Sequence, residues 1–177
     1  MRIALCGASG TGKTALLKRI SQEYRLPVNP IGARSVAAEM GFANPYDVDA
    51  AGRRAEFQKK LLEAKLDWEV LADRFVTDRT PFDVIAYAGL HCSQSVDGGM
   101  IWRAVEGMRR YTHVFFCPMA AVFRPGDDPA RLKDRAYHEL FEALLDGLLR
   151  AWGVHVLRLY MEGADRWVFV RKMLEDR

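Results

Sequence analysis

The residues Gly7-Ala8-Ser9-Gly10-Thr11-Gly12-Lys13-Thr14 satisfy the pattern G-x-x-x-x-G-K-[ST] at every defined position. The short apolar run Ile3 to Cys6 precedes them, and Leu16, Leu17 and Ile20 follow at helical spacing. These patterns predict a strand, a glycine-rich loop and a helix, in the order that the motif requires. An ordinary glycine turn before a helix is the alternative.

Loops of this pattern are typical of proteins that hold nucleotide phosphates. The glycines let backbone N–H groups curl around the phosphates, and the N-terminus of the following helix adds positive potential. We predict that Lys13 reaches the β and γ oxygens of ATP and that Thr14 ligates Mg²⁺. The predicted nucleotide-binding residues are Gly7, Ala8, Ser9, Gly10, Thr11, Gly12, Lys13, Thr14 and Ala15.

Outward from this loop, short apolar runs alternate with helical patterns along the chain. Further strands are predicted at 75–77, 113–117 and 154–159, and helices at 14–24, 34–40, 48–71, 81–90, 100–110, 132–152 and 165–174. This alternation predicts an α/β fold of the three-layer P-loop NTPase type, in which a mostly parallel sheet carries helices on both faces. The loop and Asp78-Arg79 both follow strands, so we expect them to face one crevice.

Length and composition indicate one soluble domain over residues 1–177. Half of the residues are hydrophobic, and no run approaches the roughly 18 consecutive apolar residues that a membrane span needs. The start lacks the pattern of a signal peptide, and Cys6, Cys92 and Cys117 form no C-x-x-C pair. We therefore expect a cytoplasmic protein with no membrane partner. The net charge of +3 suits phosphate-bearing ligands, but no Lys/Arg run marks a nucleic-acid arm.

The loop by itself serves kinases, GTPases and motor ATPases alike. A motor ATPase usually has a strand that ends in Asp-Glu, whereas Asp78 is followed by Arg79. A GTPase needs an N-K-x-D base reader, which the sequence lacks, and Asp49-Ala50-Ala51-Gly52 precedes a predicted helix rather than following a strand. A kinase is favoured. A nucleotide-binding ATPase or regulatory module remains the alternative from another class.

The segment Phe75-Val76-Thr77-Asp78-Arg79-Thr80-Pro81-Phe82-Asp83, followed by Tyr87, resembles a motif of P-loop nucleoside and nucleotide kinases. The resemblance is to the thymidylate-kinase and ribosylnicotinamide-kinase types, and in layout to small phage kinases. It implies that Asp78 acts on the acceptor hydroxyl or on the Mg²⁺ shell. It also implies that Arg79 contacts the acceptor or the moving phosphoryl group. A surface Asp-Arg ion pair is the alternative.

The same family closes a small arginine-bearing lid over the phosphates, and residues 118–135 resemble that lid. Arg131 and Arg135 are spaced i, i+4 and would project from one helix face. Arginine suits this task because its planar fork can hold two phosphate oxygens. We predict both arginines as catalytic residues. A solvated helix face, paired with neighbouring aspartates, is the alternative.

The acceptor pocket is expected between the helix after the glycine loop and the second strand. Its predicted residues combine cations that can hold phosphate with aromatic rings that can stack on a base. They are Arg34, Phe42, Tyr46, Arg53 and Phe82. Ordinary packing is the alternative for the aromatic residues.

These observations predict in-line transfer of the γ-phosphate of ATP to a nucleotide-type acceptor. One acceptor class is a free nucleoside or nucleotide. The other is a hydroxymethylated pyrimidine in DNA, the substrate of phage 5-hydroxymethyluracil DNA kinases. The small size of the chain and its pI of about 8.8 favour the second class, because DNA phosphates attract a positively charged protein.

Overall fold

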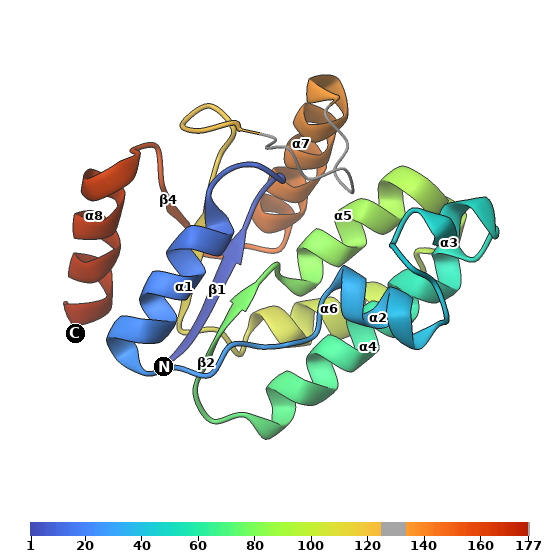
Figure 1. Cartoon of the computed structure of the whole chain (residues 1–177), viewed down its shortest axis with the longest axis horizontal. Coiled ribbons are helices and arrows are strands. Elements are labelled where there is room, and N and C mark those ends of the chain that lie inside the picture. Colours follow the sequence, from blue (N-terminus) through green and yellow to red (C-terminus); the bar gives the residue numbers. More distant parts are fainter. Residues whose placement is uncertain (125–133, 177) are drawn as a thin grey trace.

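The computed structural model describes residues 1–124 and 134–176 and has, within them, a four-stranded parallel sheet in the order β2-β1-β3-β4 (Figure 1). The strands are β1 Arg2–Cys6, β2 Phe75–Asp78, β3 His113–Phe116 and β4 Leu157–Arg158. Leu5 of β1 lies opposite Asp78 on one side and Phe115 on the other. The strand that leads into the glycine loop is therefore flanked by β2 and β3.

Helices connect successive strands, as parallel pairing requires. They are α1 Lys13–Tyr24, α2 Ala33–Glu39, α3 Asp47–Ala50, α4 Arg54–Leu71, α5 Pro81–Cys92, the 3₁₀ turn η1 Ser93–Ser95, α6 Gly98–Met108, α7 Arg135–Ala151 and α8 Gly163–Glu175. Within the described residues, we find no helix whose length and apolar character would let it cross a membrane.

Two apolar cores on opposite faces of the sheet hold the layers together. Alternate side chains of a strand point to opposite faces, so Ile3 and Leu5 pack with α1 and α8. Ala4 and Cys6 pack on the other face with residues of α2 and α4 to α7. Figure 1 shows α8 beside α1, away from α4 and α5. This arrangement confirms the predicted three-layer α/β fold.

Two predicted elements differ from the observed ones. The helix expected at 48–71 is broken into α3 and α4, because Gly52 adopts a left-handed backbone with φ of +67°. The strand expected at 154–159 is only the pair Leu157–Arg158. It pairs with β3 at the outer side of the sheet, where a short strand suffices to cover the edge.

Candidate active site

The glycine loop is shaped by a close approach to β3 and ends on an open helix N-terminus. Gly7 has φ of +123°, and a Cβ atom there would lie 2.5 Å from the carbonyl oxygen of Cys117. Only glycine fits this position without a shift of the backbone. Gly12 precedes α1 with φ of +80°, and no side chain of the described residues caps the first turn. The first N–H groups of α1 are therefore available to an anion.

Lys13 lies buried along the loop, with its ammonium group near the phosphate position that the motif predicts. Its Nζ donates to the carbonyl oxygen of Ala8 and, at 3.3 Å, to Oγ1 of Thr11. Burial and, to a lesser extent, the neighbouring charge of Arg79 lower the pKa of Lys13 to about 8. An anion that binds at this position will raise this pKa.

Two cavities meet at the carboxyl ends of β1 and β2. The first, of about 290 Å³, is lined by the loop, by Lys13 and Ala15, and by Arg124. The second, of about 510 Å³, extends between α2, α4, α5 and the start of α7. Ser9, Thr14, Asp78 and Arg79 line both cavities. We call the first the donor cavity and the second the acceptor cavity, and these four residues the junction.

Asp78 places a carboxylate at the junction, directly beside the first turn of α1. Its Oδ2 accepts from Oγ1 of Thr14 at 3.4 Å, and its buried Oδ1 has no hydrogen-bond partner in the described part of the chain. A hydroxyl and a carboxylate are oxygen ligands of the kind that Mg²⁺ prefers. Thr14 and Asp78 therefore fit a Mg²⁺ ion. Among the described residues, no group of three or more acidic, histidine or cysteine side chains could hold a metal.

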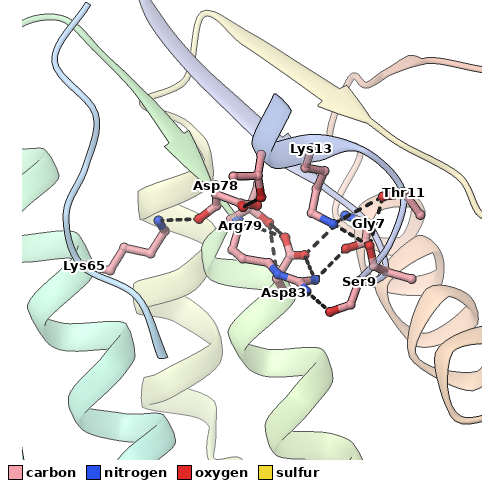
Figure 2. Close-up of polar contacts among 11 residues, drawn as sticks. Gly7, Ser9, Thr11, Lys13, Lys65, Asp78, Arg79 and Asp83 are labelled. Atoms are coloured by element: carbon pink, nitrogen blue, oxygen red, sulfur yellow. Dashed lines mark hydrogen bonds and ion pairs between the residues drawn. The ribbon is translucent and has the colours of Figure 1, made fainter. Parts of the chain in front are cut away.

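Arg79 adopts a left-handed backbone, with φ of +75°, that turns its guanidinium group back toward the loop. It donates to the carbonyl oxygen of Gly7 at 2.5 Å and to Oγ of Ser9 at 2.8 Å (Figure 2). Burial acts to lower its pKa, but Tyr87 and the carboxylates of Asp83 and Asp78 hold the pKa above its usual value. Arg79 is thus a fixed positive charge between the two cavities.

Asp83 is a site residue that the sequence prediction missed. It is fully buried in the first turn of α5, where its carboxylate accepts from the backbone N–H of Thr80 at 2.7 Å and of Gly7 at 3.3 Å. It also pairs with Arg79 at 3.1 Å. The spacing Thr80-x-x-Asp83 is a capping signal that could have revealed the helix start. The contact with Gly7, 76 residues away, has no local signal.

Arg166 of α8 supports the loop from the other face of the sheet. It is buried, and its guanidinium group donates to the carbonyl oxygen of Thr11 at 2.8 Å. It also donates to the carbonyl oxygens of Leu159 and Met161, which precede α8. The loop therefore has an arginine contact on each side, Arg79 on one and Arg166 on the other.

The acceptor cavity contains some of the predicted acceptor residues and excludes others. Arg34 and Tyr46 line it. Within the described residues, Phe42, Arg53 and Phe82 lie outside its lining. Phe82 is fully buried in the core, and Phe42 packs against the same core from its edge. Arg53 is exposed and holds Glu56 with two hydrogen bonds, of 2.6 and 2.8 Å.

Other residues line the acceptor cavity in place of Phe42, Arg53 and Phe82. Arg54, one position after Arg53, lines the cavity and pairs with Asp49. The aromatic walls come from Phe57, Tyr87 and Tyr137.

The predicted lid falls partly outside the described residues. Arg131 lies in the segment 125–133 that the structure does not describe. Arg135 begins α7, is exposed, pairs with Glu139 at 2.8 Å, and lines neither cavity. Arg124 lines the donor cavity, and its backbone N–H donates to the carbonyl oxygen of Gly10 at 2.8 Å.

A protein-family model described as an AAA domain matches residues 2–166 of this chain. No curated protein matches the sequence. Among solved structures, NadR protein in complex with NR has a TM-score of 0.74 at 17% identity, and the match covers 98% of this chain and 50% of that one. This chain therefore spans about half the length of NadR.

Two further structures match over their whole length. Deoxyadenosine kinase from M. mycoides with bound dATP has a TM-score of 0.63 at 15% identity, covering 99% of this chain and 100% of that chain. Thymidylate kinase from Ehrlichia chaffeensis has a TM-score of 0.53 at 17% identity, covering 99% and 98%. At these identities the similarities show the fold alone, and they agree with the predicted three-layer α/β fold.

Proposed function

The chain belongs to this AAA-domain family, and we propose that it is an ATP-dependent phosphotransferase acting on a nucleotide-type acceptor. The observation that carries the proposal is the junction. The glycine loop opens on one cavity, a second cavity lies beyond it, and the carboxylate of Asp78 lines both. In-line transfer needs a donor phosphate and an acceptor held on either side of one point, with charged groups around it.

Lys13 and three junction residues, Thr14, Asp78 and Arg79, have distinct roles in this proposal. The loop N–H groups and Lys13 bind the β and γ phosphates of ATP. Thr14 and Oδ2 of Asp78 would hold Mg²⁺, which neutralises charge on those oxygens. Oδ1 of Asp78, which is buried and unpartnered in the described residues, accepts the proton of the attacking hydroxyl. Arg79 holds its charge beside the moving phosphoryl group.

Three of the four Lys and Arg side chains that line the acceptor cavity are paired with carboxylates, which favours a hydroxyl as the acceptor group; the fourth is Arg34. Arg54 already pairs with Asp49, Lys65 with Glu69 and Arg79 with Asp83. An acceptor phosphate would need a cation that is not committed in this way. The aromatic walls in turn support an acceptor with a flat base.

Two sources of such a hydroxyl follow from the sequence. The first is a free nucleoside, which the size of the acceptor cavity and the match to a deoxyadenosine kinase fold support. The second is 5-hydroxymethyluracil in DNA, which the resemblance to phage kinases and the basic pI support. A base in duplex DNA would have to be flipped out of the stack to enter the cavity.

The experiment is transfer of label from γ-labelled ATP to a panel of nucleosides, nucleotides, unmodified DNA and DNA that contains 5-hydroxymethyluracil. We expect label on a hydroxyl-bearing acceptor and none with Asp78→Asn. If modified DNA is the acceptor, binding should weaken with salt, with a log–log slope of about −3 for three or four phosphate contacts. Label released only as inorganic phosphate would favour the ATPase module and refute the kinase.

A further inference from the structure

A charged pair, Lys65 and Glu69, is buried in α4, and Lys65 lines the acceptor cavity. Lys65 is 1% exposed and Glu69 is fully buried, and Nζ of Lys65 lies 3.2 Å from Oε1 of Glu69. Lys65 belongs to the lining of the acceptor cavity. Burying two charges is costly, and apolar side chains of similar size would often serve stability as well or better. The pair therefore calls for another explanation.

The ammonium group of Lys65 is directed to the end of β2, as Figure 2 shows. It donates to Oγ1 of Thr77 and to the carbonyl oxygen of Asp78 at 3.3 Å, and it forms an ion pair with Glu69. A lysine ammonium has three N–H donors, and two of them make these hydrogen bonds to the end of β2. The contacts of Lys65 are therefore with β2 and with Glu69 of the protein itself.

The position of β2 explains why the carbonyl group of Asp78 needs such a partner. β2 is the outer strand of the sheet in the described residues, and β1 is its only neighbouring strand there. A single bridge between Val28 and Val76 covers its other edge. The carbonyl groups at an uncovered edge lack the partner that a further strand would supply. Lys65 takes the place of that strand at the residue that carries the junction carboxylate.

Glu69 joins this contact to the wall of the acceptor cavity. Its carboxylate accepts from Nδ2 of Asn29 at 2.9 Å and from the hydroxyl of Tyr111 at 2.7 Å. Oδ1 of Asn29 in turn accepts from the backbone N–H of Ile31 at 2.9 Å. Asn29 and Ile31 both line the cavity. One buried network therefore fixes the backbone of Asp78 and the cavity wall opposite it.

We propose that the Lys65–Glu69 pair is a positioning unit that sets the carboxylate of Asp78 relative to Thr14 and to the acceptor. This inference rests on the proposed phosphotransferase function for its effect on transfer. Its effect on Mg²⁺ binding, however, depends only on the geometry of Thr14 and Asp78. The two effects can therefore be measured separately.

The test replaces both members of the pair, because Lys65→Met alone would leave Glu69 buried and uncompensated. The double variant Lys65→Met/Glu69→Leu keeps side-chain volume and leaves no lone buried charge, but Asn29 and Tyr111 lose their acceptor, so the thermal midpoint should fall. We expect its kcat to fall on the order of 10- to 100-fold, the scale of a misplaced catalytic group. The Mg²⁺ concentration that half-saturates ATP binding should rise at least about threefold, whereas ATP affinity without Mg²⁺ should stay the same.

The matched control is Glu63→Leu/Arg103→Met, which removes an ion pair from α4 and α6 that is about half exposed. It should leave kcat and the Mg²⁺ requirement within about twofold, as expected for a surface pair. Thr77→Val keeps both buried charges and removes one partner of the ammonium group. It should change the Mg²⁺ requirement in the same direction by a smaller factor, and it provides the test if the double variant does not fold.

The outcomes separate the two proposals. In the Asp78→Asn background, the double variant should lower kcat no further, because the pair acts through Asp78. A folded double variant with unchanged kcat and Mg²⁺ requirement would show that the pair is structural only. If the wild-type protein transfers no phosphate but the Mg²⁺ requirement still shifts, the phosphotransferase function fails and the positioning role stands.

Discussion

At the scale of single residues, the ammonium group of Lys13 should make the affinity for ATP depend on pH. Its pKa is lowered to about 8 in the nucleotide-free protein, and bound phosphates will raise it. Between these two pKa values the complex binds one more proton than the free protein. The affinity for ATP should therefore fall as pH rises above about 8, by up to about tenfold per pH unit. Titration calorimetry between pH 7 and 9.5 measures this slope.

Lys13→Ala provides the control, because its loop keeps the glycines but has no titrating ammonium group. Its fold should be unchanged by circular dichroism, its phosphoryl transfer lost, and its ATP affinity flat from pH 7 to 9.5. An equal slope in the variant and the wild-type protein would show that another group titrates.

Asp78 and Thr14 should be separable by kinetics. Asp78→Asn removes the proton acceptor and one Mg²⁺ ligand, so kcat at saturating Mg²⁺ should fall by at least about 100-fold and the Mg²⁺ requirement should rise, with little change in ATP binding at saturating Mg²⁺. Thr14→Ala should chiefly raise the Mg²⁺ requirement. Steady-state assays at several Mg²⁺ concentrations distinguish these effects. If Asp78→Asn instead abolishes ATP binding and preserves kcat, Asp78 has no role in proton transfer.

At the scale of the elements, Asp83 ties the start of α5 to the glycine loop. Asp83→Asn leaves the charge of Arg79 without its buried partner, and urea unfolding should show a loss of about 2 kcal/mol. A fully buried pair would lose about 3 to 5 kcal/mol, but 24% of the Arg79 side chain is in contact with water. Glu139→Gln, which breaks the exposed pair with Arg135, should cost below about 1 kcal/mol. If Asp83→Asn and Glu139→Gln lose the same free energy of unfolding, Asp83 contributes no more to stability than an exposed ion pair does.

The turn from β1 into the loop gives a second test at this scale. Gly7→Ala places a Cβ atom 2.5 Å from the carbonyl oxygen of Cys117, in a backbone region that side chains rarely adopt. We expect a loss of about 1 to 3 kcal/mol and weaker ATP binding. Gly89→Ala, inside α5 with open space around it, should instead stabilise the protein by about 0.5 to 1 kcal/mol. Melting curves of both variants check the contrast.

At the scale of the whole molecule, local patterns predicted the elements and topology predicted the junction. The strand, loop and helix around Lys13 follow from adjacent residues, so their pattern was sufficient. The meeting of Thr14 with Asp78 follows from the rule that parallel strands end at one edge, and it is confirmed.

The acceptor wall depended on details that no local pattern contains. Gly52 breaks the predicted helix, so that Arg53 precedes α4 and pairs with Glu56. Arg54, the first residue of α4, lines the cavity where Arg53 was expected. The contacts of Asp83 with Gly7 and of Lys65 with Asp78 join distant segments, so only the fold reveals them.

The proposed reaction transfers a phosphoryl group from ATP to a hydroxyl. The most direct measurement is ³¹P NMR of the product formed from ATP, Mg²⁺ and the acceptor that takes the label. We expect a phosphomonoester resonance that grows with ADP and is absent with Asp78→Asn. A new terminal phosphoanhydride would identify a phosphate acceptor, and inorganic phosphate alone would identify hydrolysis. Either result would contradict the claim.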